Sequence, residues 1–181
     1  ETGAFGNGST TGSAAPVQIG TGTDWDSLAV MPGATCATKS DRTLWCAGTN
    51  DSGQLGLGST TSTTTFAPVI GSWRQVAAGG KTACGVRVDN TLWCWGANSS
   101  GQVGDASTTV RTSPVQIAAG TLWSSVDVGS ASTCAVSATG QLWCWGANDA
   151  GQVGDSTTET RTAPVQIGSA QAWATVSIGP R

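Results

Sequence analysis

Hydrophobic residues alternate with polar or small residues over short stretches, which are separated by glycine, asparagine, aspartate and serine. In Leu142-Trp143-Cys144-Trp145, a period of two places both tryptophans on one face of a strand and Leu142 and Cys144 on the other. Both faces are therefore apolar, as expected for a strand enclosed between neighbouring sheets. The pattern predicts short β-strands joined by turns.

The strand pattern repeats at intervals close to 50 residues. A tryptophan opens each unit at Trp25, Trp73, Trp123 and Trp173, with intervals of 48, 50 and 50 residues. Each unit contains four apolar stretches, and four short strands in a repeat of this length are typical of a β-propeller blade. We therefore predict an all-β fold of three complete four-stranded blades, with partial units at both ends.

The recurring tryptophans divide the chain into units of one propeller domain. The predicted units are a partial repeat at 3–24, complete repeats at 25–72, 73–122 and 123–172, and the start of a further repeat at 173–181. Residues 1–2 lie outside the pattern and are interpreted as an expression scar. Because three blades do not close a normal ring, we predict that the segment is part of a larger propeller or assembles into one.

A Pro-Val segment gives a second landmark in each unit. It recurs at Pro16, Pro68, Pro114 and Pro164, with intervals of 52, 46 and 50 residues. The unequal intervals predict two inserted residues before Pro68 and four deleted residues after it, both in loops.

The third strand of each unit leads into the motif W-G-x-N-x-x-G-Q-[LV]-G, which resembles the repeat signature of the regulator of chromosome condensation family. Two copies match in full, whereas the copy that begins at Leu44 has Ala47 in place of the second tryptophan. The resemblance implies a propeller whose ring normally has seven blades. It also implies a structural role for the matching residues, which are Trp95, Gly96, Asn98, Gly101, Gln102, Gly104, Trp145, Gly146, Asn148, Gly151, Gln152 and Gly154.

Two features depart from the nuclear members of this family. Family members usually carry a His-Thr pair on the second strand, and this chain has no histidine. Its paired cysteines are absent from the nuclear members and are similar to those of extracellular relatives, including bacterial secreted repeat proteins and the ectodomains of crinkly-type plant receptor kinases. The resemblance therefore implies a secreted or extracellular protein.

The six cysteines fall into three pairs, each separated by ten positions across a short predicted hairpin. Directly paired strand positions place Cβ atoms about 4.5–5.5 Å apart, close to the roughly 3.5–4.5 Å that a disulfide needs. A cysteine metal site is the weaker alternative, because the chain has neither C-x-x-C spacing nor histidine. We predict an oxidising compartment and the disulfides Cys36–Cys46, Cys84–Cys94 and Cys134–Cys144.

Three Asn-x-Ser sequons are candidate sites of N-glycosylation in a eukaryotic secretory pathway, at Asn7, Asn50 and Asn98. They carry little weight, because a chain so rich in serine produces sequons by chance.

Charge excludes several classes of partner. The net charge is −3, and the eight lysines and arginines are scattered singly, so no basic stripe exists for nucleic acid or an anionic membrane surface. No apolar run reaches the roughly 18 residues of a membrane span, and no signal peptide is present. We therefore predict neither a nucleic-acid partner nor membrane insertion.

Residues suited to catalysis are scarce. Without histidine, acid–base chemistry near neutral pH would fall to carboxylates, which lie mainly in predicted turns. Asp105 and Asp155 recur in register with Arg111 and Arg161, which indicates a structural turn or a surface ion pair. A calcium site at either aspartate is the weaker alternative. We predict no enzyme activity, no catalytic residue, no metal and no cofactor.

The function predicted from these patterns is a non-catalytic, secreted propeller module for protein binding or for self-assembly, with a homo-oligomer formed through the incomplete end blades. Positions that differ between repeats are candidate contacts, notably Arg74, Gln75 and Lys81. The alternatives are a lectin-like carbohydrate-binding propeller and an extracellular enzyme inhibitor. Carbohydrate binding is disfavoured because all nine tryptophans occupy repeated positions and none is left for stacking on a sugar.

Overall fold

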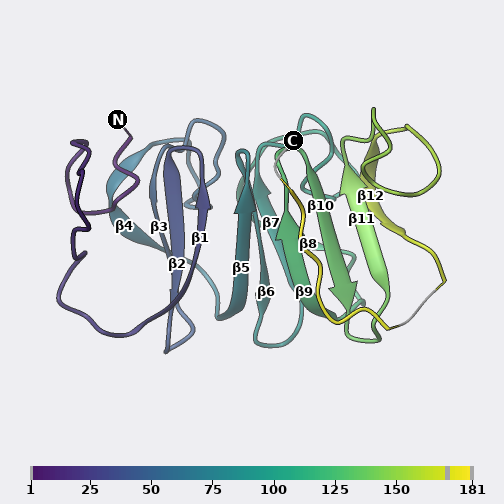
Figure 1. The fold of residues 1–181 in the computed structure, drawn as a ribbon, viewed down its shortest axis with the longest axis horizontal. Coiled ribbons are helices and arrows are strands. Elements are labelled where there is room, and N and C mark those ends of the chain that lie inside the picture. The colour runs from purple at the N-terminus through teal and green to yellow at the C-terminus, as the bar shows by residue number, and fades with distance from the viewer. Residues whose placement is uncertain (1, 170–171, 180–181) are drawn as a thin grey trace.

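The computed structural model describes residues 2–169 and 172–179, which form twelve β-strands in three sheets (Figure 1). The first blade consists of β1 (Trp25–Met31), β2 (Ala34–Lys39), β3 (Leu44–Gly48) and β4 (Thr63–Val69). The second blade consists of β5 (Trp73–Gly79), β6 (Thr82–Arg87), β7 (Leu92–Gly96) and β8 (Arg111–Ile117). The third blade consists of β9 (Trp123–Val128), β10 (Ser132–Ser137), β11 (Leu142–Gly146) and β12 (Arg161–Gln166).

Each blade is an antiparallel sheet whose four strands lie in chain order. The blades stand side by side, and the first strands β1, β5 and β9 lie next to one another along the row (Figure 1). The predicted all-β propeller architecture is confirmed. Within residues 2–169 and 172–179, no helix is long and apolar enough to cross a membrane.

The hydrophobic core lies at the junctions between blades. At the junction of the first and second blades, Leu44 and Leu55 pack with Trp73 and Trp95, all of them fully buried. At the next junction, Leu92 and Val103 pack in the same way with residues of the third blade, namely Trp123, Val126, Ala135 and Trp145. A blade is therefore stabilised mainly by its neighbours, as in other repeat folds.

The register of the fourth strands corrects the predicted insertion near Pro68. Leu44 pairs with Val69 where Leu92 pairs with Ile117, so Phe66 occupies the position of Pro114. The short Pro-Val match at Pro68 is displaced by two residues from its structural equivalent, because strand pairing and burial of Val69 fix the register. The repeat is shorter only after β4, where four positions separate Val69 from Trp73, against six from Ile117 to Trp123.

All six cysteines form disulfides between directly opposed residues of the second and third strands of a blade. The Cα atoms of each pair lie 4.0–4.1 Å apart. The pairs are Cys36–Cys46, Cys84–Cys94 and Cys134–Cys144, as predicted. Each disulfide is thus local to one blade and links no blade to the next.

Candidate protein-docking faces

The loop after the third strand of each blade is organised by a buried asparagine. Asn98 accepts a hydrogen bond from the N–H of Val103 at 2.9 Å and donates to the carbonyls of Ser107 and Thr109. The same bonds are made by Asn50 in the first blade and Asn148 in the third. All three asparagines are fully buried, so the Ser/Thr loops are anchored to the fold.

The residues that follow this asparagine join one blade to the next. The carbonyl of Gln102 accepts the indole N–H of Trp145 at 2.9 Å and the hydroxyl of Thr133 at 2.8 Å. The carbonyl of Gln54 accepts the indole N–H of Trp95 in the same way at 3.0 Å. We call residues 50–56, 98–104 and 148–154 the connectors. A connector fixes the position of the following blade with a buried, directional bond.

The second and third connectors are each followed by an aspartate, Asp105 and Asp155, that is more buried than a carboxylate in a solvated turn. Asp105 forms an ion pair with Arg111 at 2.5 Å, and Asp155 forms one with Arg161 at 2.6 Å. The side chains of the two aspartates are only 10% and 5% exposed. Both carboxylates also accept hydrogen bonds from the buried asparagine and from a loop hydroxyl. The pair is therefore structural, and the oxygens are engaged by protein donors.

Hydrogen bonds determine the pKa of these carboxyl groups. Burial by itself raises the pKa of Asp105, but hydrogen bonds from Ser107 and Arg111 outweigh it and hold the pKa below its usual range. Hydrogen bonds from Thr157 and Arg161 lower the pKa of Asp155 strongly. Because the folded-state pKa values are depressed, these groups stabilise the fold fully above the unfolded pKa of about 3.9.

Acid is therefore expected to destabilise the protein through these two groups. As pH falls below about 4, their stabilisation should be lost progressively, because the unfolded chain takes up protons before the folded one. The measurement is the urea midpoint over a pH series, for the wild type and the variant Asp105→Asn/Asp155→Asn. The variant should be less stable at neutral pH and lose less stability in acid. An unchanged acid dependence in the variant would contradict the assignment.

Two of the three predicted sequons are inaccessible in the folded chain. The side-chain nitrogens of Asn50 and Asn98, to which a glycan would attach, are buried and donate to loop carbonyls. A glycan at either position would break the anchor of its loop, so these two predictions are corrected. Asn7 is exposed, and its glycosylation stays a prediction.

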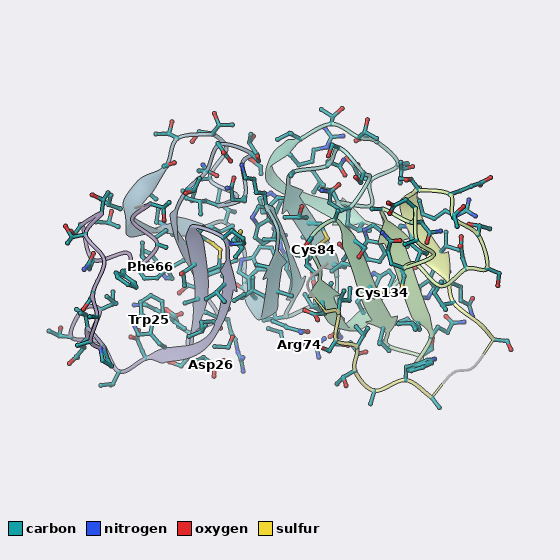
Figure 2. All side chains as sticks on the ribbon, turned by 45° about the horizontal axis from the view of Figure 1, so that its top comes forward. Trp25, Asp26, Phe66, Arg74, Cys84 and Cys134 are labelled. Atoms are coloured by element: carbon teal, nitrogen blue, oxygen red, sulfur yellow. A yellow bond between two sulfur atoms is a disulfide. The ribbon has the colours of Figure 1, made fainter. Side chains whose placement is uncertain are left out.

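The variable positions proposed as partner contacts are used between blades. Arg74 donates to the carbonyls of Trp123 and Ser124 at 3.0 and 2.9 Å, across the junction of the second and third blades (Figure 2). Gln75 donates to the carbonyl of Val126, and Lys81 forms an ion pair of 2.6 Å with Asp51 of the first blade. These side chains therefore connect blades. Arg74 and Lys81 are also exposed, and their contact with a partner stays a prediction.

The first strand of the first blade exposes side chains whose counterparts are buried. Leu28 and Val30 are 67% and 61% exposed, whereas Val76 and Val126, which hold the position of Leu28, are 7% and 1% exposed. A cavity of about 470 Å³ beside this strand is lined by Phe5, Trp25, Leu28 and Phe66, among others. We call this surface the first end face. Its apolar side chains are of the kind that pack at a blade junction, but no neighbouring blade covers them.

Phe66 completes this face in place of the tryptophan that is missing at position 47. Its ring lies 5.1 Å from that of Trp25, where Trp73 and Trp95 lie 5.4 Å apart in the second blade (Figure 2). Residues 3–8 run along β4, and Gly3 packs on Thr64 as Gly53 packs on Thr112. This segment therefore occupies the place that a connector from a preceding blade would take.

The opposite end of the row shows the other half of a junction. Val176 and Ile178 pack on the Cys134–Cys144 disulfide and Val153, and Trp173 donates its backbone N–H to the carbonyl of Gly140. Trp73 and Trp123 make the corresponding bonds to Arg42 and Asn90. Residues 172–179 thus follow the course of a first strand without forming a ladder. A cavity of about 630 Å³ beside them defines the second end face, lined by Cys134, Gln152 and Ile178, among others.

The connector motif lies within the parts of this chain that match a known repeat family. Two models of the Regulator of chromosome condensation (RCC1) repeat match the chain, one over residues 73–102 and 123–152 and the other over residues 89–136 and 139–181. Together these matches cover more than half of the chain. The chain belongs to the RCC1 repeat family. The connector residues of both matched units, Asn98 with Gln102 and Asn148 with Gln152, lie within the matches.

The chain resembles the solved structures of Prp20p in fold. Prp20p from Saccharomyces cerevisiae superposes with a TM-score of 0.72 at 20% identity, over 81% of this chain and 39% of Prp20p. Yeast RCC1 (Prp20) bound to Kap60 gives 0.71 at 20% identity, over 81% of this chain and 37% of that protein. The ectodomain of the Physcomitrella patens receptor kinase CR4 gives 0.47 at 22% identity, over 68% and 29%. No curated protein matches the chain.

The chain therefore spans well under half the length of the yeast RCC1 protein. The repeat signature marked the connectors correctly as recurring positions, since Asn, Gln and Gly recur there in register. The end faces were not evident from the signature, because they depend on which side of β1 is covered. One signal was present in the sequence: Phe66 stands two residues before Pro68, in the unit that lacks its second tryptophan.

Proposed function

We propose that this chain is a protein-binding RCC1-repeat propeller segment whose end faces each accept a further propeller blade. The observation that carries the proposal is the exposure of Leu28 and Val30 on β1, since Val76 on β5 and Val126 on β9, the equivalents of Leu28, and Val128, the equivalent of Val30 on β9, are buried within junctions. Fully burying a leucine or valine side chain contributes about 1.5–3 kcal/mol. The blade can come from a second copy or from another protein with the same repeat.

The family supports a protein-binding role. Prp20p is described for its binding properties toward Gsp1p and histones, and yeast RCC1 (Prp20) is bound to Kap60 in its structure. Because the chain spans only 39% and 37% of those proteins, their partners are not transferred to it. The three disulfides support a secreted module, since disulfides persist in oxidising compartments.

The terminal segments determine how a blade would dock. Residues 172–179 lie where the first strand of a following blade would pack, and residues 3–8 lie where a preceding connector would pack. A docking blade must displace these segments. The exchange is favourable because a complete blade brings three further strands with paired backbone groups, whereas residues 172–179 form no ladder.

Self-association tests this proposal on the chain by itself. The absolute mass, measured by light scattering on a sizing column without reductant, should rise with concentration above the 18.0 kDa monomer. Leu28→Asp/Val30→Asp should abolish the rise, because it places two charges in the junction. Ile178→Asp should enhance it, because it weakens the packing of the segment that a second copy displaces.

The matched control is Val88→Asp, which changes an apolar residue of similar exposure, 54%, on the turn after β6. This variant should associate like the wild type. A mass that stays at the monomer value at every concentration, or equal association of the Leu28→Asp/Val30→Asp variant, would rule out docking through the end faces.

A further inference from the structure

The last residue of the second strand differs between blades in a way that changes the surface beside two tryptophans. In the first blade, the ammonium of Lys39 lies 4.9 Å from the ring centre of Trp25 and 5.4 Å from that of Trp45. In the second blade, the guanidinium of Arg87 takes this position, 5.1 Å from the ring of Trp73 and 3.7 Å from that of Trp93.

The third blade has the two equivalent tryptophans, Trp123 and Trp143, but no lysine or arginine at the end of its second strand. Ser137 pairs with Trp123 in the register in which Arg87 pairs with Trp73. Its hydroxyl is engaged locally, by the hydroxyl of Thr139 and the backbone N–H of Gln141. No lysine or arginine of the described chain is placed over Trp123 or Trp143.

The grooves between successive blades reflect this difference. Between the first and second blades, a groove of about 330 Å³ is lined by Arg87 together with Pro68 and Pro114. Between the second and third blades, the equivalent groove is larger, about 410 Å³, and is lined by Trp123 and Trp143 themselves. We call the latter the rim groove. Its other lining residues include Asp105, Gln116 and Pro164.

A hydrogen-bond donor in the rim groove also lacks the acceptor that its counterparts have. The indole N–H groups of Trp45 and Trp93 donate to the hydroxyls of Thr43 and Thr91 at 2.9 and 2.8 Å. Gln141 replaces this threonine in the third blade, and the indole nitrogen of Trp143 is buried with no hydrogen-bond partner among the described residues. Such a donor gains from an acceptor on a ligand.

We propose that the rim groove binds an arginine side chain of a partner protein. A guanidinium stacks on indole rings and is only weakly hydrated, and Arg87 on Trp93 shows the same contact inside this chain at 3.7 Å. A backbone carbonyl of the partner accepts the indole N–H of Trp143. Charge favours the same ligand: the chain carries a net charge of −3, and the groove lining contains Asp105 and no basic residue.

The charge of Asp105 is partly balanced by Arg111, which lies 2.5 Å from it. The indole of Trp143, rather than that carboxylate, therefore selects the guanidinium, since Trp123 lines the floor of the groove and is only 1% exposed. All the residues that line the rim groove belong to the second and third blades, so its binding does not depend on what covers the end faces.

The test uses the peptide acetyl-Gly-Arg-Gly-amide and its citrulline analogue, which keeps the shape of the side chain and removes the charge. Binding is followed through the indole N–H signal of Trp143 in nitrogen–proton correlation spectra, assigned with Trp143→Phe. The arginine peptide should shift this signal and bind at least about fivefold more tightly than the citrulline peptide, as a cation–π contact of order 1 kcal/mol requires.

Two substitutions distinguish the groove from other sites. Ser137→Arg supplies the cation of the second blade and should abolish binding, whereas Ser137→Ala should retain it. Arg87→Ser removes the cation of the second blade and should create a second site for the peptide, seen as a new shift of the Trp93 indole signal. The gain of a site keeps the proposal testable if Ser137→Arg fails to fold.

The proposal would be overturned by equal binding of the citrulline peptide, by unchanged binding to a folded Ser137→Arg variant, or by the absence of any shift with the arginine peptide. A shift of the Trp143 signal with a neutral oligosaccharide and none with the arginine peptide would also overturn it, in favour of carbohydrate recognition.

Discussion

Reduction of the three disulfides is expected to unfold the protein at room temperature. Each bridge closes a loop of about ten residues, and its loss lowers the free energy of unfolding by about 3 kcal/mol in the chain-entropy model. Domains are typically stable by only about 5–15 kcal/mol, so the combined loss is comparable to the whole. Each bridge lies within a single hairpin, and no disulfide links one blade to the next.

Urea unfolding with and without reductant measures this effect. The double variant Cys84→Ala/Cys94→Ala should lose about 3 kcal/mol, since it removes the bridge of the middle blade. Cys134→Ala/Cys144→Ala serves as the matched comparison in the third blade. Its Cys134 is 8% exposed, whereas Cys84 of the second blade is fully buried. A reduced chain with an unchanged urea midpoint would show that packing alone maintains the blades.

Gly104→Ala is expected to destabilise the protein by about 2–5 kcal/mol, the sum of a left-handed backbone cost and overpacking. Gly104 has a φ of +87°, and a Cβ there would lie 2.5 Å from the indole nitrogen of Trp145. That indole is fully buried and donates to Gln102, so it cannot move away without losing its bond.

Gly154→Ala provides the matched control in the third connector. Its φ is +81°, but the nearest atom to a Cβ would be on Ile167 at 3.7 Å. The control should therefore show only the backbone cost, about 1–2 kcal/mol. The difference between the two urea midpoints measures how tightly a connector packs on the next blade. Equal losses would show that backbone conformation alone explains both glycines.

Features that are local in sequence were predictable. The strands follow from alternation, as in Leu142-Trp143-Cys144-Trp145, and the disulfides follow from cysteines that face one another across a hairpin. The connector positions were found because Asn98 and Asn148 recur in register. In each case the determining contact spans few residues, so the spacing carries the information.

Features that depend on contacts between blades were missed. The Pro68 landmark was wrong because a two-residue match cannot compete with the pairing of Leu44 with Val69. Arg74 and Lys81 varied between repeats and so suggested partner contacts, yet they reach carbonyls and a carboxylate of the neighbouring blade. Variation at these positions reflects differences between junctions, which only the packed structure reveals.

The connectors also give the row of blades a direction. The first and second connectors each place a glutamine carbonyl against the indole N–H of a tryptophan in the following blade, so the first end face and the second end face are chemically different surfaces. Copies that associate through them cannot be related by a two-fold axis that pairs like with like; they join head to tail. The rotation between successive copies then decides the particle: a rotation that divides a full circle closes a ring of fixed size, and any other produces a filament.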